Sequence, residues 1–489
     1  MLNRKLLILF GILILIAGSL LISGGASSLL LSAESILNRP LNTAFWGIGL
    51  GHAGIELLLL GVNIILLDAF YKKNPGKILL LSSSVWILSF LAFAIFNAAN
   101  IPYHDDYYFL EFLNSYSDKR DLSEIFTQGN ESRLILMKGL CVILFHLGAF
   151  NFKALIVIPL LCLLGSAFLL FHSAILEKSH KHLLILLLTV LIFQFQYYDA
   201  TIWASGALYN SCTLFFAIAS VYCLTNKMKY GFLFALTASL LGVASCGAGF
   251  ISLAVGSVIL VTAKRKKESI VWILISVAVA ALYLNNYSFS HNHYATAGGT
   301  ESIAHKILST LLFSVTFLGS SLQFLYQLWL PFLLGIFIWI TFMIATARKY
   351  HLKNPTIYYI FLFLLLTSFA PPLLRKNLPM FEGINIRYGI YSIFSISCCI
   401  LFWSEAIAQN KVKKILLYLF PVALSFHLLT GIFFFPEVAL RKEEALKMAH
   451  NFKQTNSASL PVPYKQGPSN AVYLFNICKE KNIYQLPEE

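Results

Sequence analysis

The neighbouring carboxylates Asp105 and Asp106 are the feature of this sequence that most directly predicts chemistry. They follow His104 in the stretch NAANIPYHDDYYFL, a few residues after an apolar run ends. Adjacent carboxylates raise each other's pKa unless a cation lies nearby, so the pair suits a general base that takes a hydroxyl proton. The pair equally suits half of a site for a divalent metal, Mg²⁺ or Mn²⁺. The alternative is a solvated cap for the following helix, because an aspartate at a helix start offsets the helix dipole.

Arg133 is the first of several basic residues that could bind a phosphate. It follows Asn130 and Glu131 at the point where the chain enters an apolar stretch, residues 133–150. A guanidinium can hold a phosphate bidentately, which a lysine does poorly. Glu131 could pair with Arg133 or act as a separate acid. The alternative for Arg133 is a side chain that reaches toward the lipid headgroups.

A second group of basic residues lies in the stretch PPLLRKNLPMFEGINIRYGIYSIF. Arg375 and Lys376 end one apolar run, and Arg387 and Tyr388 begin the next. An anionic, lipid-linked substrate requires such positive charge at a membrane surface, and interfacial anchoring is the alternative for each residue. The candidate catalytic residues are therefore Asp105 and Asp106, and the candidate substrate- or phosphate-binding residues are His104, Asn130, Glu131, Arg133, Arg375, Arg387 and Tyr388.

The overall composition indicates that lipid is the main solvent of this chain. Of its 489 residues, 58% are hydrophobic and only 12% are charged, and the mean hydropathy is +0.74. Apolar runs of about 20 residues recur almost throughout, and in lipid they must be helices because each backbone polar group needs a partner within its own segment. The net charge of +14 does not indicate nucleic acid, because lysines and arginines cluster in short loops between the apolar runs, as the positive-inside rule requires.

These basic clusters predict a cytoplasmic N-terminus, an outer C-terminus and about 13 crossings, within about 12 to 15. If the stretches 133–150 and 306–321 crossed the membrane, the basic loops would no longer all lie on the cytoplasmic side. We therefore expect re-entrant or interfacial helices there, on the outer face. Polar residues within apolar runs are costly and more often functional than surface ones. Such residues include Gln194, Gln196, Asp199, Asn210 and His427. The predicted spans lie near residues 6–24, 43–68, 78–97, 152–176, 182–197, 203–224, 230–246, 248–263, 270–285, 326–347, 356–373, 386–407 and 414–435.

The chain is expected to have three parts. Residues 1–75 form an apolar hairpin, and residues 76–435 form a transmembrane core with a large outer loop at 98–132. Residues 436–489 form an outer tail, in which 437–453 predict a short amphipathic helix and Pro461, Pro463 and Pro468 predict loop. The eight cysteines include no CxxC pair and predict neither a disulfide framework nor a zinc site.

Five short motifs, in order, resemble those of the GT-C superfamily of membrane glycosyltransferases, and more narrowly a bacterial group that uses polyprenyl-phosphate sugars. The stretch His104-Asp105-Asp106 resembles the acidic motif of the first large outer loop. FTQGNESRLI resembles the signature Q-H-N-E-H-R-I, with Gly129 and Ser132 in place of its two histidines. SCGAGFISL is similar to the F-x-N-G-L hairpin, LLFSVTFLGSSL to the L-L-G-S-P-L stretch, and NIRYGIYSIF to the S-R-Y motif that opens a late span. The likeness covers about residues 90 to 410.

The resemblance implies an inverting glycosyltransferase in a bacterial inner membrane. Such an enzyme moves a sugar from a polyprenyl-phosphate donor to a glycan or lipid acceptor on the periplasmic face, and some relatives use a divalent metal. The chemistry agrees, because Arg133 and Arg387 could hold the leaving phosphate while Asp105 or Asp106 deprotonates the acceptor hydroxyl. The alternatives are a lipid-linked glycan flippase or other transporter, an O-antigen-type polymerase or ligase, and a non-catalytic scaffold. A transporter would be expected to show mid-bilayer charges and internal symmetry.

Overall fold

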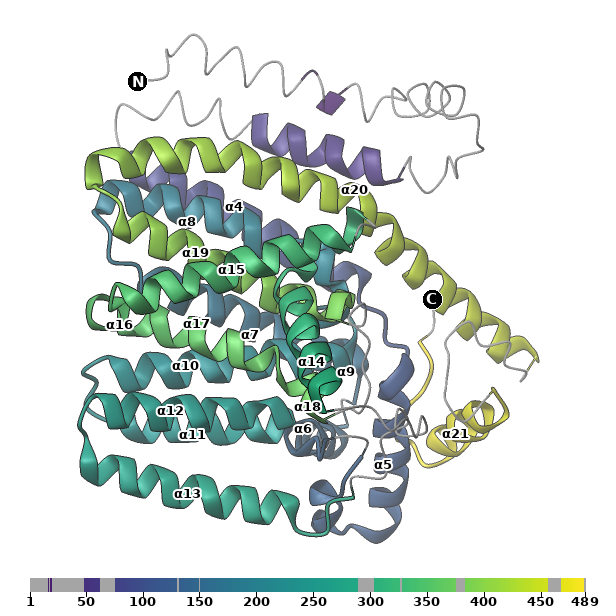
Figure 1. Ribbon diagram of the computed structural model, residues 1–489. Helices are drawn as coiled ribbons and strands as arrows, with labels where there is room; N and C mark the ends of the chain where they lie inside the picture. Colours follow the sequence, from purple (N-terminus) through teal and green to yellow (C-terminus); the bar gives the residue numbers. More distant parts are fainter. Residues whose placement is uncertain are drawn as a thin grey trace. The chain divides into compact units, whose positions relative to one another are not determined.

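The computed structural model describes residues 16, 18–19, 48–61, 75–129, 132–148, 150–288, 303–325, 328–374, 383–455 and 468–487 (Figure 1). All regular secondary structure within these ranges is helical, and no strand occurs among them. The prediction of an all-α fold is therefore confirmed for the described residues.

Eight helices in the described ranges are long and apolar enough to cross a membrane, which supports a membrane protein. They are Leu79–Asn97, Phe152–His172, Ala204–Thr225, Lys266–Leu284, Trp329–Ala347, Pro355–Leu373, Ile386–Ala406 and Asn410–Thr455. Shorter apolar helices are Ile48–Gly61, Ile135–His146, His180–Ile192, Gly231–Ser245, Gly247–Thr262 and Ala304–Leu318. The count of about 13 crossings, and the side of the membrane on which each loop lies, stay predictions.

The two stretches expected to be re-entrant or interfacial form short helices. They are α6 (Ile135–His146), with 12 residues, and α14 (Ile303–Leu318), with 16 residues. Both are shorter than the roughly 20 residues that a span across the hydrocarbon core needs. Their placement at the outer face stays a prediction.

The last part of the chain differs from the prediction. We expected a span that ends near residue 435 and a separate amphipathic helix, but α20 (Gln409–Thr455) is one helix of 47 residues. Pro436 lies inside α20, where a proline removes one backbone hydrogen bond and kinks a helix without necessarily ending it. Pro468, expected in a loop, begins α21 (Pro468–Glu480). Proline suits a first helical position because its φ is already helical and its missing N–H is not needed there.

The chain divides into two compact units, and each combines segments that are far apart in the sequence. Unit 1 comprises Met1–Asn97, Ile175–Tyr198 and Trp403–Lys442. Unit 2 comprises Ala98–Ala174, Asp199–Phe402 and Glu443–Glu489. Helices separated along the chain therefore pack within one unit, and the expected sequence boundaries at residues 75 and 435 stay a prediction.

In unit 1, α4 (Pro75–Asn97) packs along α8 (Lys178–Ile192). Aromatic rings fill the space beside these helices. The rings of Phe90 and Phe195 stack with centroids 5.1 Å apart, and those of Phe93 and Phe435 lie 4.5 Å apart. A buried carboxylate, Glu405, accepts a hydrogen bond from a backbone N–H at 2.8 Å.

In unit 2, α10 (Thr213–Thr225) lies among four neighbouring helices (Figure 1). These are α7 (Phe152–His172), α11 (Gly231–Ser245), α12 (Phe250–Thr262) and α17 (Pro355–Thr367). Small residues bring the helices close, as is typical of membrane helices. The Ser239 hydroxyl of α11 donates to that of Ser220 in α10 at 2.8 Å, and Gly256 of α12 lies against the Trp272 ring of α13 (Lys266–Leu284).

The turn between α11 and α12 depends on Gly249, the last residue of η6 (Gly247–Gly249). A Cβ built on Gly249 would lie 2.1 Å from the carbonyl carbon of Gly242, so a side chain there must push backbone against backbone. We expect Gly249→Ala to lower the free energy of unfolding by about 1–3 kcal/mol, as overpacking does, and to lower Tm measured in detergent.

Gly139→Ala is the matched control, because a Cβ on Gly139 in α6 meets nothing within 4 Å. Alanine in a helix interior is favoured over glycine by about 0.5–1 kcal/mol, so this variant should be slightly more stable than the wild type. Equal Tm values for the two variants would contradict the close approach at Gly249.

Candidate functional site

A cavity in unit 2 is lined by residues from each of the five motif segments described in the sequence analysis. About 820 Å³ of empty space, which includes open solvent, lies between its lining residues. Asp105 and Arg387 are the charged residues among the described ones that line it. The lining residues are Asp105, Ser132, Tyr209, Asn210, Cys246, Gly247, Ala248, Phe317, Thr367, Ala370, Pro371, Arg387, Tyr388 and Tyr391.

Asp105 is held by a short 3-10 helix, η2 (His104–Asp106), that directly precedes α5 (Tyr107–Lys119). His104 adopts a left-handed φ of 47°, which turns the chain sharply before the two carboxylates. The Trp203 indole N–H donates to the Tyr103 carbonyl at 2.8 Å, and the rings of Tyr103, His104 and Trp203 pack together. The Asp105 side chain lines the cavity and forms no hydrogen bond with the described residues.

Asp106 has a different role from its neighbour, because its carboxylate is 2% exposed and bonded to backbone. One oxygen accepts the N–H of Tyr103 at 3.1 Å and the other accepts the N–H of Ser205 at 2.8 Å. Asp106 thus ties η2 to the start of α9 (Ala204–Ala207). Burial, with a further contribution from the Asp106 carboxylate, raises the pKa of the Tyr107 phenol well above its usual range. Of the predicted catalytic pair, only Asp105 lines the cavity.

The contacts of Asp106 also concern the predicted divalent metal, which Asp105 and Asp106 would hold together. Both Asp106 oxygens accept backbone N–H groups, and Asp106 is not among the residues that line the cavity. Among the described residues, no group of three or more His, Cys, Asp or Glu side chains is arranged to hold a metal ion. A divalent metal held by Asp105 and Asp106 stays a prediction.

Arg133 uses its guanidinium to hold backbone. Its side chain donates to the carbonyl oxygen of Tyr283 at 2.7 Å and to those of Phe126 and Asn285. The guanidinium also lies over the Tyr283 ring, with its carbon 5.7 Å from the ring centroid. These bonds tie the end of α13 to the segment before α6, and Arg133 is not among the residues that line the cavity.

Arg387 and Tyr388 lie in η10 (Ile386–Tyr388), directly before α19 (Gly389–Ala406), and both line the cavity. The Asn385 side chain accepts the backbone N–H of Arg387 at 3.2 Å and fixes the start of this turn. The Tyr388 ring packs on Phe317 with centroids 4.7 Å apart. The half-buried guanidinium at this position is the cationic counterpart of Asp105 in the cavity.

A small-residue segment and a break in a helix complete the lining. Ser132 shares a hydrogen bond with the Cys246 thiol at 3.8 Å and accepts the N–H of Gly247 at 3.4 Å. Tyr209 and Asn210 come from a π-helical turn, η5 (Leu208–Cys212), a distortion that often occurs at functional sites. Sequence reasoning singled out Asn210 as a polar residue in an apolar run but missed Tyr209, because a tyrosine in such a run equally suits packing.

Three predicted binding residues, Asn130, Glu131 and Arg375, lie outside the residues that the structure describes. His104 is described but does not line the cavity, and its ring packs against Tyr103 and Trp203. No protein family, curated protein or solved structure matches the chain.

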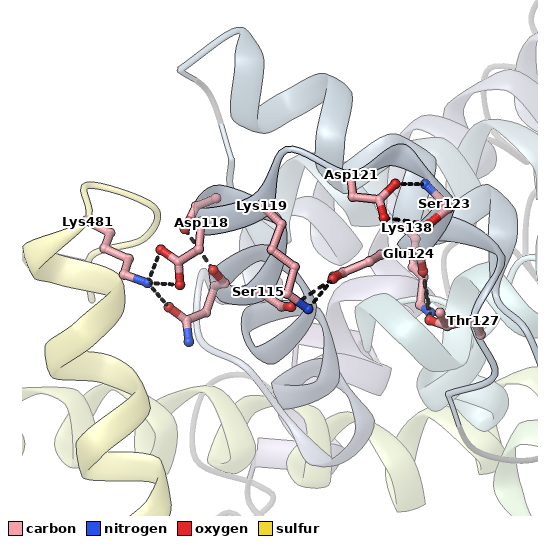
Figure 2. A network of polar contacts seen from close by, with 11 residues as sticks. Ser115, Asp118, Lys119, Asp121, Ser123, Glu124, Thr127, Lys138 and Lys481 are labelled. Atoms are coloured by element: carbon pink, nitrogen blue, oxygen red, sulfur yellow. Dashed lines mark hydrogen bonds and ion pairs between the residues drawn. The ribbon is translucent and has the colours of Figure 1, made fainter.

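The helix that follows Asp105 is held in place by the end of the chain (Figure 2). The Lys481 ammonium donates to both carboxylate oxygens of Asp118 in α5, at 2.6 and 2.7 Å, and to the side chain of Asn114 at 2.8 Å. Beside these polar contacts, the Phe475 ring of α21 packs on Tyr107, with centroids 5.8 Å apart. Phe475 is 3% exposed, whereas the Asp118 side chain is 58% exposed.

A second part of this network fixes the segment that leads from α5 toward Ser132 (Figure 2). Glu124, in η3 (Leu122–Phe126), accepts hydrogen bonds from Ser115 at 3.1 Å and from Lys119 at 2.8 Å. The buried Lys138 ammonium of α6 donates to the carbonyl oxygens of Glu124 and Thr127 and to the Thr127 hydroxyl, at 2.8–3.2 Å. The side chains of α5, η3 and α6 therefore form one connected support for this side of the cavity.

The buried Phe475 ring should contribute more to the stability of unit 2 than the exposed ion pair of Lys481 does. We expect Phe475→Ala to destabilise unit 2 by about 3–5 kcal/mol, because it removes a buried ring and leaves a cavity. Lys481→Met should cost less than about 1 kcal/mol, since it removes an exposed ion pair. Tm values of the two variants, measured in the same detergent, test this order. A larger loss for Lys481→Met would mean that the ion pair, and not the packed ring, holds α5.

Proposed function

We propose that this protein is a GT-C-type membrane glycosyltransferase that moves a sugar from a polyprenyl-phosphate donor to a hydroxyl acceptor. The observation that carries the proposal is one cavity lined by all five motif segments, with one carboxylate, Asp105, and one guanidinium, Arg387. A glycosyl transfer from a phosphate needs a base for the acceptor and a positive charge for the leaving group. The cavity supplies one of each.

Asp105 acts as the general base in this proposal. Its carboxylate takes the proton of the acceptor hydroxyl as the oxygen attacks the anomeric carbon of the donor sugar. The new bond between oxygen and carbon forms while the bond between that carbon and the phosphate oxygen breaks. A single displacement of this kind inverts the configuration at the anomeric carbon. The proton ends on Asp105, and the electron pair of the broken bond leaves with the phosphate.

Arg387 binds the phosphate of the donor and stabilises the charge that develops on it as it leaves. A guanidinium suits this role because it presents two parallel N–H donors to phosphate oxygens. The rings of Tyr209, Tyr388 and Tyr391 offer apolar faces and hydroxyl groups for a sugar. Arg133, which holds three backbone carbonyls, acts in this proposal as a positioning residue for the segment that contains Ser132.

The position of the cavity residues along their helices also supports a lipid-linked donor. Cys246 follows the last residue of α11, Thr367 ends α17, and Arg387 lies in η10, the turn directly before α19. Residues at the ends of apolar helices lie near the headgroup level, where the phosphate of a polyprenyl lipid would also lie. We place this site on the periplasmic face of a bacterial inner membrane, with a glycan or lipid as acceptor.

The proposal is tested by sugar transfer with purified protein in lipid. The donors are a panel of radiolabelled polyprenyl-phosphate sugars, and the acceptor is a crude glycolipid extract. We expect a labelled product whose anomeric configuration is opposite to that of the donor, and none from protein-free vesicles. Retained configuration would contradict the single displacement. Movement of labelled glycolipid across the bilayer without transfer would favour the flippase instead.

A further inference from the structure

Unit 1 contains a buried cluster of ionisable side chains that the proposed transfer does not use. Glu56 and His52 lie one turn apart on the apolar helix Ile48–Gly61, and His427 comes from α20. The side chains of His52, Glu56 and His427 are 10%, 12% and 2% exposed. Ionisable groups in apolar helices are costly and therefore mark function more often than surface charges do. The aromatic rings against the two histidines are Trp86, Phe93, Phe195 and Phe435.

The contacts of His427 fix where protons must be. Its Nδ1 lies 2.9 Å from the backbone carbonyl oxygen of Val190, and a carbonyl can only accept, so Nδ1 bears a hydrogen. Its Nε2 lies 2.8 Å from the Glu56 Oε1 atom. A neutral imidazole with its hydrogen on Nδ1 has a lone pair at Nε2, as the carboxylate has at Oε1. The short contact therefore requires one shared proton, on the carboxyl or on the imidazole.

The rest of the cluster shows where the carboxylate could turn if that proton left. The His52 Nε2 atom lies 3.7 Å from the same Oε1 atom of Glu56, just beyond hydrogen-bond reach. Two further buried atoms, His52 Nδ1 and Glu56 Oε2, have no hydrogen-bond partner among the described residues. Both lie beside Gly431, where an added Cβ would sit 3.4 and 3.5 Å from them. The glycine leaves space next to both atoms.

We propose that Glu56 and His427 form an intramembrane proton-binding site, with His52 as the alternative hydrogen-bond partner of the carboxylate. Release breaks the bond to the shared proton, which passes to water, and leaves a carboxylate and a neutral imidazole with no change in electron count. The two lone pairs then repel across 2.8 Å, and the carboxylate turns toward the N–H of His52. The titratable groups that act on Glu56 within the described part of unit 1 are His52 and His427. The neighbouring α4 and α8 contribute the Trp86 ring and the Val190 carbonyl.

Infrared difference spectroscopy of the protein in lipid, recorded across a pH titration, tests the site. As the pH rises, we expect the wild type to lose the signal of the Glu56 carboxyl group that shares a proton with His427. A histidine ring signal should change at the same midpoint pH. In Glu56→Gln both should be absent, because the glutamine amide donates permanently to His427 Nε2 and mimics the loaded form. Glu405→Gln is the matched control, since it removes a buried carboxylate of unit 1 that accepts a backbone N–H and should leave both signals in place. A Glu56→Gln spectrum identical to that of the wild type overturns the proposal.

Nitrogen NMR of the wild type labelled at histidine makes the test independent of any variant. His427 should keep its hydrogen on Nδ1 at every pH, and the Nε2 environment should change once, at the midpoint of the carboxyl signal. A His427 ring with its hydrogen on Nε2 and a bare Nδ1 would refute the shared proton. If the nitrogen signals of the His427 ring stay the same from acidic to alkaline pH, the bond to Glu56 is permanent. That result would overturn the proposed release of the proton. Sugar transfer is not part of either readout, so these outcomes are separate from those of the proposed transferase.

Discussion

Asp105→Asn is expected to reduce sugar transfer by about 100- to 10,000-fold, the contribution typical of a general base. The amide keeps the size of the carboxylate but cannot take the hydroxyl proton. Because Asp105 lines the cavity and forms no hydrogen bond with the described residues, its replacement should leave Tm nearly unchanged. The measurement is kcat with saturating donor and acceptor, together with Tm on the same preparation. The loss should appear in kcat, since the proton moves in the transition state.

Asp106→Asn is the control that separates chemistry from folding. Asparagine has one acceptor oxygen, so its NH₂ group must face one of the two backbone N–H groups that the Asp106 carboxylate accepts. A buried donor left without an acceptor costs about 1–3 kcal/mol, and Tm should fall accordingly. Activity should fall only as far as the shifted η2 displaces Asp105. Asp106→Asn could instead lose most of its kcat at unchanged Tm while Asp105→Asn stays active. Asp106 would then be the general base, and Asp105 would not.

The difference between these neighbours could not be predicted from the sequence. Two adjacent aspartates have the same local composition, and which of them is buried depends on the left-handed backbone of His104 and on the amide of Ser205, about a hundred residues away. The same limit applies to Arg133. Its place at the edge of an apolar stretch suggested a phosphate clamp, but its guanidinium reaches the end of α13, a contact that only the tertiary structure brings about.

Other features of the molecule were accessible from patterns alone. Composition and hydropathy predicted helices throughout, and the regular secondary structure of the described residues is helical. The ordered motifs pointed to segments that, in the structure, line one cavity. The division into two units and the continuity of α20 past Pro436 were not predicted, because they depend on which apolar faces pack together and not on the apolar character of each segment. Of the cluster around Glu56, only His427 was singled out in the sequence, although His52 and Glu56 also lie in a predicted span, residues 43–68.

Arg387→Met is expected to lower kcat/KM for the lipid-linked donor by about 100- to 1,000-fold, as the loss of one preorganised charge stabiliser does elsewhere. Methionine keeps much of the apolar stem and removes the charge. If Arg387 acts mainly on the leaving phosphate, kcat falls, because that charge develops in the transition state. If it only holds the donor, KM rises with kcat unchanged. Kinetics with varied donor at saturating acceptor distinguish the two, and the proposed mechanism predicts a fall in kcat.

Arg133→Met removes the same charge from the same unit and so controls for any general electrostatic effect. Its guanidinium bonds to three backbone carbonyls, and the loss of these charge-assisted bonds should lower Tm while the folded fraction keeps most of its kcat. The two arginines thus give opposite patterns: activity lost at constant stability for Arg387, and stability lost at nearly constant activity for Arg133. Near wild-type kcat/KM in Arg387→Met would remove the cationic half of the proposed site. Because the described lining offers Arg387 as its one cation, the phosphate would then need a group from outside the described residues, and Asp105 alone would not define a transferase.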